Sequence, residues 1–165
     1  MNILKKNIKL LITLFILLGA SFNSNLVYAA SNVDADGDKA TLYNSGKKLI
    51  LRAKKLEKKD KVEKAQKLYL KALSKFEKAY KKDKKNANLL NYFGYALRKT
   101  GDFEKAEIYY LKGLELKPKH KGINEYLGEL YVQTDRIELA KERLEVLKEC
   151  NCEEYDELKE LIEEN

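Results

Sequence analysis

The sequence predicts an all-α protein made of antiparallel helix hairpins, and three observations lead to this fold class. Small and apolar residues return every three or four positions from about residue 41 to the end of the chain. The composition favours helix, with many Lys, Glu, Leu and Ala residues, a single proline and no tryptophan. Two consecutive segments of 34 residues also align without gaps. The 165 residues suit one domain with a buried core.

The first 29 residues have the three parts of a secretory signal peptide. Three lysines within residues 1–9 form a positive start, residues 10–20 (LLITLFILLGA) are an apolar run, and residues 27–29 (VYA) match a cleavage site. The apolar run is shorter than the roughly 20 residues that span a bilayer. We therefore expect cleavage after residue 29 and a periplasmic protein. The alternative is an uncleaved leader that anchors the chain in the inner membrane.

Residues 30–40 are acidic and rich in turn-forming residues, and we expect them to form a flexible N-terminal segment. When the segment is aligned on its glycine, four side chains occupy the first ligand positions of a calcium-binding loop: Asn32, Asp34, Asp36 and Asp38. The twelfth position of such a loop needs a bidentate glutamate, and this chain has Tyr43 there. The sequence therefore predicts no metal site, and no motif indicates a cofactor.

A divergent first hairpin is expected over residues 41–86. Its helices, about 41–58 and 62–82, each carry an apolar stripe, and the polar residues 58–61 separate them. After residue 29 the net charge is only +4, and the lysines are mixed with glutamates at helical spacing. We therefore interpret them as solvated helix faces and expect no nucleic-acid partner.

Two repeats follow, over residues 87–120 and 121–152, and residues 153–165 form a capping helix. Gly94 and Gly128 match within the predicted first helices, where glycine costs about 1 kcal/mol relative to alanine. We expect a neighbouring helix to pack closely against each of them. Helix starts are predicted at Gly101-Asp102 and, as a capping box, at Asp135 with Glu138.

The repeat resembles the tetratricopeptide repeat family. Its pattern of large and small residues appears as Leu90, Phe93, Gly94, Leu97, Ala106, Tyr110, Gly113 and Pro118. The second copy departs from this pattern at Asn124 and Cys152. Half a copy precedes the first repeat, with the second-helix residues Tyr69, Ala72, Phe76 and Ala79. The resemblance implies a right-handed solenoid that binds proteins, and the tail from Cys150 is similar to the endings of small exported bacterial repeat proteins.

In this family the first helices of successive repeats line a concave groove. By repeat position, the resemblance implies a partner-binding groove formed by eight residues: Asn88, Asn91, Tyr95, Arg98, Glu125, Glu129, Val132 and Gln133. The alternative interpretation is that they are ordinary solvated helix surface. The clamp of lysines and asparagines that some family members use for a C-terminal carboxylate is not reproduced.

Cys150 and Cys152 are the only cysteines, and in an oxidising compartment they are candidates for a local disulfide that fixes a turn. Redox activity and free or intermolecular thiols are the alternatives. The single histidine, His120, falls in a predicted surface loop, and no catalytic group is indicated. We therefore predict a non-enzymatic scaffold, assembly or holding factor that binds a peptide or helix of another protein. The alternative is a structural subunit whose groove is filled by its own helix or by a second copy in a homo-oligomer.

Overall fold

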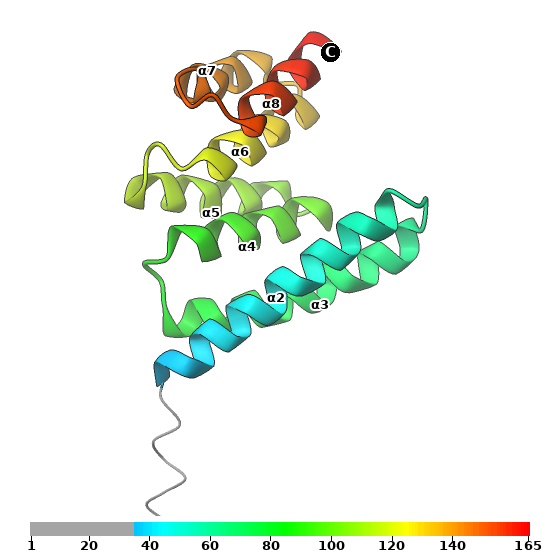
Figure 1. The fold of residues 1–165 in the computed structure, drawn as a ribbon, viewed down its shortest axis with the longest axis vertical. Coiled ribbons are helices and arrows are strands. Elements are labelled where there is room, and N and C mark those ends of the chain that lie inside the picture. The colour runs from blue at the N-terminus through cyan, green and yellow to red at the C-terminus, as the bar shows by residue number, and fades with distance from the viewer. Residues whose placement is uncertain (1–34) are drawn as a thin grey trace, which may run out of the picture. The chain divides into compact units, whose positions relative to one another are not determined.

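The computed structural model describes residues 35–165, which form seven α-helices. Three antiparallel hairpins follow one another along the chain, and a final helix packs on the last hairpin (Figure 1). The helices are α2 (Ala35–Glu57), α3 (Val62–Lys82), α4 (Ala87–Lys99), α5 (Phe103–Leu116), α6 (Lys121–Gln133), α7 (Ile137–Leu147) and α8 (Glu153–Glu163). The predicted all-α hairpin-repeat fold is confirmed. The predicted signal peptide lies outside the described residues.

The first helix begins earlier than expected. α2 starts at Ala35, so residues 35–40, which we expected to belong to a flexible segment, are helical. The Thr41 hydroxyl donates to the Gly37 carbonyl, and Asp38 forms an ion pair with Lys82 at the end of α3. A carboxylate in the first turn also interacts favourably with the helix dipole. These local contacts extend the helix into a segment whose composition alone resembles a turn.

The three hairpin turns share one backbone design. A residue with positive φ immediately precedes the N-cap of the second helix in each hairpin: Asp60 before Lys61, Gly101 before Asp102, and Asp135 before Arg136. As predicted, the Asp102 carboxylate caps α5 by accepting a hydrogen bond from the Lys105 amide at 3.3 Å.

The predicted capping box at Asp135 and Glu138 is wrong. Asp135, with φ of 58°, takes the place that Gly101, with φ of 90°, has in the preceding repeat. The N-cap of α7 is the next residue, Arg136, and its side chain makes no capping hydrogen bond. The sequence pattern misled because aspartate tolerates the left-handed conformation and is also a favoured N-cap residue.

The first helices of the two repeats also start alike. Asn86 caps α4 and, 34 residues later, His120 caps α6, because each side chain accepts a hydrogen bond from a backbone amide three residues on. His120 lies in the loop before α6, as expected, but it is half-buried there and caps the helix. The amide of Asn124, which breaks the family pattern, is fully buried and donates to the carbonyls of Pro118 and His120, both at 3.0 Å. These bonds hold the junction between the repeats.

Close helix packing at the glycines is confirmed. A Cβ atom on Gly94 would lie 2.6 Å from a ring carbon of Tyr110, a side chain of α5 that is fully buried. A Cβ atom on Gly46 of α2 would lie 2.4 Å from a ring carbon of Phe76 on α3. The absence of a side chain thus lets aromatic rings lie directly on the opposing helix. No helix within residues 35–165 is long and apolar enough to cross a membrane.

Candidate partner-binding face

The eight residues predicted to line the groove lie on one face of α4 and α6, but most of them are covered. Asn88 and Gln133 are exposed, and Glu129 is half-buried. The others are at most 8% exposed: Asn91, Tyr95, Arg98, Glu125 and Val132. The face therefore has a buried floor and a narrow accessible rim.

Side chains from α2 and α3 cover the floor at Tyr95. The Tyr95 ring packs against the Tyr126 ring of α6, with the centroids 4.7 Å apart, and against the Tyr69 ring of α3 at 6.0 Å. Lys54 of α2 reaches across, so that its Nζ lies 5.5 Å from the Tyr95 centroid and 5.6 Å from the Tyr126 centroid. Its ammonium also donates to the Tyr126 hydroxyl at 3.5 Å. A cation over two rings ties α2 to both repeats.

Arg98 joins three of the predicted residues in one network. Its guanidinium forms an ion pair with Glu129 and donates to the Gln133 side chain at 2.8 Å, so α4 and α6 are linked by charge-assisted bonds. The same guanidinium lies 5.4 Å from the Tyr95 ring centroid. Arg98 is 6% exposed, so this ion pair is much less screened by solvent than a surface pair.

Glu125 is the most unusual ionisable group of the face. It is 3% exposed, and burial, followed by a hydrogen bond with Glu157 of α8, raises the pKa of its carboxyl to about 9. At neutral pH the side chain is therefore protonated. Lys54 opposes this rise, and Glu129 adds to it. Helix α8 thus covers the face at Glu125, whereas α2 covers it at Tyr95 and Tyr126.

Two buried polar atoms of the floor have no hydrogen-bond partner within the described chain: Asn91 Oδ1 and Arg98 Nε. A buried unpaired polar atom costs about 1–3 kcal/mol. Tyr110 Oη and Asn124 Oδ1 are buried and unpaired as well, so such atoms are not confined to the predicted groove residues and do not by themselves indicate a binding role.

Sequence reasoning missed three residues of the face: Lys54, Tyr126 and Glu157. The equivalence of Tyr126 with Tyr92 was a usable signal, because a tyrosine recurs at one repeat position. No signal pointed to Lys54 or Glu157, since α2 does not align with the later repeats and α8 was expected only to cap the stack.

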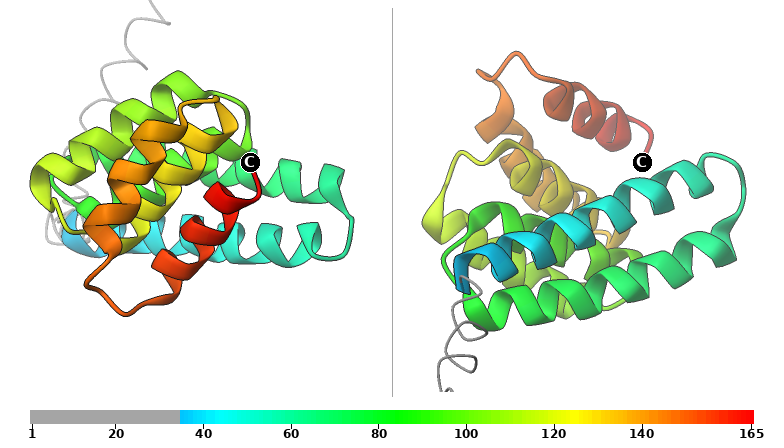
Figure 2. Two further views of the ribbon diagram at one scale, coloured as in Figure 1. Left: turned by 90° about the horizontal axis from the view of Figure 1, so that it is seen from above. Right: turned by 60° about the horizontal axis from the view of Figure 1, so that its bottom comes forward.

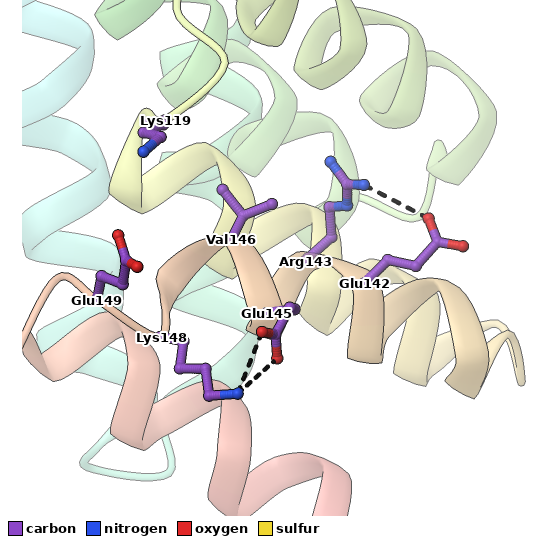
Figure 3. Close-up of a pocket in the computed structure, with 7 residues that line it drawn as sticks. All are labelled: Lys119, Glu142, Arg143, Glu145, Val146, Lys148 and Glu149. Carbon is purple, nitrogen blue, oxygen red and sulfur yellow. Dashed lines mark hydrogen bonds and ion pairs between the residues drawn. The ribbon is translucent and has the colours of Figure 1, made fainter.

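One surface hollow lies elsewhere. It has a volume of about 550 Å³, lies along α7 beside the α5–α6 connection, and includes none of the eight predicted residues. Figure 3 shows that charged side chains dominate its lining and that several of them pair with one another, Lys148 with Glu145 and Arg143 with Glu142. Because four of these six charged side chains are already paired and Val146 is the only apolar side chain of the lining, we assign no binding role to this hollow.

The sulfur atoms of Cys150 and Cys152 lie at disulfide distance, in the turn between α7 and α8. Cys152 is the N-cap of α8, and three carboxylates occupy the first turn: Glu153, Glu154 and Asp156. Carboxylates beside a thiol disfavour the thiolate that redox chemistry needs. Among residues 35–165, no group of three His, Cys, Asp or Glu residues could hold a metal ion.

Comparison with known proteins agrees with this architecture. Residues 49–119 match the family model described as tetratricopeptide repeat. A tetratricopeptide repeat protein from Parabacteroides merdae superposes with a TM-score of 0.52 at 18% identity, over 73% of this chain and 59% of that one. The second such domain of human RPAP3, solved with an HSP70 peptide, superposes with a TM-score of 0.50 at 21% identity, over 74% of this chain and 97% of that one. This chain therefore spans less than two thirds of the length of the first protein.

These comparisons and the helix hairpins define the class as an all-α repeat protein. Residues 49–119 are similar to tetratricopeptide repeats, as the resemblance implied, and the fold is similar to that of a solved protein of this kind. No protein of curated function matches its sequence.

Proposed function

We propose that this protein is a protein-interaction module that binds a peptide or helix of another protein on the face formed by α2, α4 and α6. One observation carries the proposal: above a buried aromatic floor, this face keeps an accessible polar rim at Asn88, Glu129 and Gln133. A peptide backbone offers both donors and acceptors and could pair with these rim side chains. The RPAP3 domain, which has a similar fold, was solved with a peptide.

The rim suits an extended or helical segment with polar groups. Asn88 and Gln133 mark its two ends as exposed amides, and Tyr92 and Tyr126 contribute half-buried rings between them. Amides can pair with a peptide backbone, and tyrosines provide contact area at low entropic cost. Binding here would act as a scaffold or holding function and needs no catalytic group.

Site-specific photo-crosslinking tests this proposal. A photoreactive amino acid in place of Gln133 should capture a partner from cell extract, because this position is exposed on the rim. The same probe in place of Leu111, which is exposed on α5, is the matched control. Equal capture at both positions, or capture only at Leu111, would contradict the assignment of the face.

A second function is favoured by the burial of the floor. Five of the eight predicted residues are covered by the chain's own side chains, with contributions from Lys54 of α2 and Glu157 of α8. A structural subunit whose groove is filled by its own helices would have this geometry. In that case Gln133 captures nothing at any protein concentration, or captures only a second copy of this chain.

Export to the periplasm through a cleaved leader is part of the proposal. It rests on residues 1–29, and the proposed Cys150–Cys152 disulfide is compatible with an oxidising compartment. N-terminal sequencing of the protein recovered from a periplasmic extract tests both steps together. An intact N-terminus in the membrane fraction would favour the anchored alternative.

A further inference from the structure

The charges of the described chain are unevenly distributed between its two ends. Residues 35–82, the α2–α3 hairpin, contain 16 Lys or Arg and six Asp or Glu. Residues 134–165, which include α7 and α8, contain five basic and 12 acidic residues. Among the later helices, the backbone of the hairpin packs on α4 and only the Lys54 side chain is seen to reach α6, so the hairpin forms one end of the stack, and α8 belongs to the other. From the charge of the whole chain we expected glutamates to balance the lysines of the hairpin. They do not.

On each helix of the hairpin, the excess positive charge lies on a face away from the buried residues. Residues spaced by three or four positions share a helix face, and the buried residues of α3 lie on a different face from its lysines. We define the cationic face as eight side chains, of which all but the half-buried Lys75 are exposed: Lys48, Arg52, Lys55, Lys64, Lys67, Lys71, Lys75 and Lys78. Of the two acids of α3, Glu63 lies four residues before Lys67, at the edge of this face, and Glu77 falls outside the spacing.

None of these eight cations has an ion-pair partner among the described residues. Some exposed cations elsewhere are paired, as are Lys105 with Asp102, Lys141 with Glu138 and Lys148 with Glu145. The α3 part of the cationic face extends for about 21 Å, at a rise of 1.5 Å per residue. In the right-hand view of Figure 2, the α2–α3 hairpin comes forward and no other described helix lies over it. This is an extended, uncovered and uncompensated positive surface.

We propose that the cationic face docks the protein on an anionic phospholipid surface. The interaction is peripheral, and no helix enters the bilayer. Two exposed leucines, Leu51 of α2 at 46% and Leu70 of α3 at 54%, lie on the same hairpin and can contact the interfacial region of the lipids. Lipid headgroups are mobile, so they can match the spacing of the lysines without a fixed register.

Two other anionic partners fit the surface less well. A nucleic acid would favour arginines and exposed aromatic rings, whereas seven of the eight cations are lysines and the exposed large apolar residues of the hairpin are aliphatic. The acidic α7–α8 end of a second copy has the right sign, but three of its carboxylates already pair with its own lysines. Exposed ion pairs between two proteins contribute little and require a fixed geometry.

The test compares two variants of the full chain that lose the same charge. The first carries Lys64→Gln, Lys67→Gln, Lys71→Gln and Lys78→Gln on the cationic face. The control carries Lys112→Gln, Lys141→Gln, Lys148→Gln and Lys159→Gln on other exposed positions. Both keep residues 1–34, so any contribution of the leader is common to all chains, and circular dichroism confirms that each variant is folded.

Co-sedimentation with vesicles of phosphatidylcholine containing about one third phosphatidylglycerol measures the affinity. A lysine near such a surface contributes about fivefold, so four lysines contribute up to several hundredfold. We expect the face variant to lose at least 50-fold in affinity and the control less than fivefold, and high salt to weaken the wild type.

Three outcomes would overturn the lipid assignment. They are equal losses in the two variants, equal wild-type binding to pure phosphatidylcholine vesicles, and tighter binding to a DNA or RNA oligonucleotide than to the anionic vesicles. Self-association that the face variant abolishes, with no vesicle binding, would assign the face to a second copy instead.

Discussion

A Cβ atom on Gly128 would lie 2.5 Å from a methyl carbon of Leu158, which is fully buried. The terminal helix α8 can therefore rest on α6 only because residue 128 has no side chain. This contact also places Glu157, the neighbour of Leu158, against the buried Glu125. One glycine thus determines how the end of the candidate binding face is closed.

Substitution of this glycine tests the contact. Gly128→Ala should destabilise the protein by about 1–3 kcal/mol, because the new methyl group overpacks the α6–α8 contact. Leu158→Ala alone should cost about 2–5 kcal/mol through the cavity that it leaves. Urea unfolding of the double variant should show a loss clearly smaller than the sum of the single losses, because each change makes room for the other. Strict additivity would show that the two residues do not touch.

The His120 cap should make stability depend on pH. Burial, and after it the nearby Lys117 ammonium, lowers the pKa of the His120 imidazole. Nδ1 of the neutral ring accepts a hydrogen bond from the Ile123 amide. Nε2 of the ring lies 2.9 Å from Asn88 Oδ1. Below about pH 6.5 the unfolded chain binds the proton more readily than the folded one, so this contribution to stability falls as the pH falls.

His120→Asn isolates this effect, because asparagine is a good N-cap that does not titrate. Between pH 7.5 and pH 5, the thermal midpoint of the wild type should fall by several degrees more than that of the variant. Asn88→Ala serves as the control, since it removes the Nε2 contact and keeps the cap. A variant that loses as much stability on acidification as the wild type would exclude His120 as the titrating group.

Glu125 should make stability depend on pH in the direction opposite to that of His120. Its carboxyl has a pKa of about 9 in the folded protein and an ordinary value near 4.5 when unfolded, so the folded state holds a proton that the unfolded state has lost. Stability should therefore decrease as the pH rises between these values. Glu125→Gln keeps the shape and removes the titration.

In guanidinium unfolding at pH 8, Glu125→Gln should be more stable than the wild type by more than about 1.4 kcal/mol, the equivalent of one pKa unit. At pH 5 the two proteins should be nearly equal. Glu157→Gln should have a smaller effect, because burial is the first cause of the raised pKa. A wild type that is the more stable of the two at pH 8 would contradict the proposed protonated state.

The proposed disulfide should contribute little to stability. Cys150 and Cys152 are separated by one residue, and closing so short a loop restricts the unfolded chain by only about 1.6 kcal/mol. Cys150→Ser with Cys152→Ser should lower the free energy of unfolding by about this amount or less, with α8 still packed on α6. Mass spectrometry of the wild type, before and after reduction, checks that the bond forms. A loss of several kcal/mol would show that the turn organises more of the fold than its size suggests.

Much of the fold could be predicted because its signals are local. Helix α3 was expected at residues 62–82 and is found there, since its apolar residues recur at the helical period over five turns. The 34-residue repeat also predicted the close packing at Gly94 and Gly128. Errors arose where one residue type serves two local structures, as Asp135 does in the turn before α7.

The binding face was predicted only in outline. Repeat position placed Arg98, Glu129 and Gln133 together, and the structure joins them in one network. Repeat position could not predict that Tyr95 and Glu125 are buried, because the side chains that cover them come from α2 and α8, far away in sequence.

The sequence by itself determined the helices, their order and the repeat, because hydrophobic periodicity and turn residues act over a few neighbouring positions. The tertiary structure alone decided that Leu158 rests on Gly128, that Glu125 keeps its proton, and that the lysines of α2 and α3 form one uncovered end. Burial and electrostatic surroundings depend on which distant helices pack together, and no local pattern contains that information.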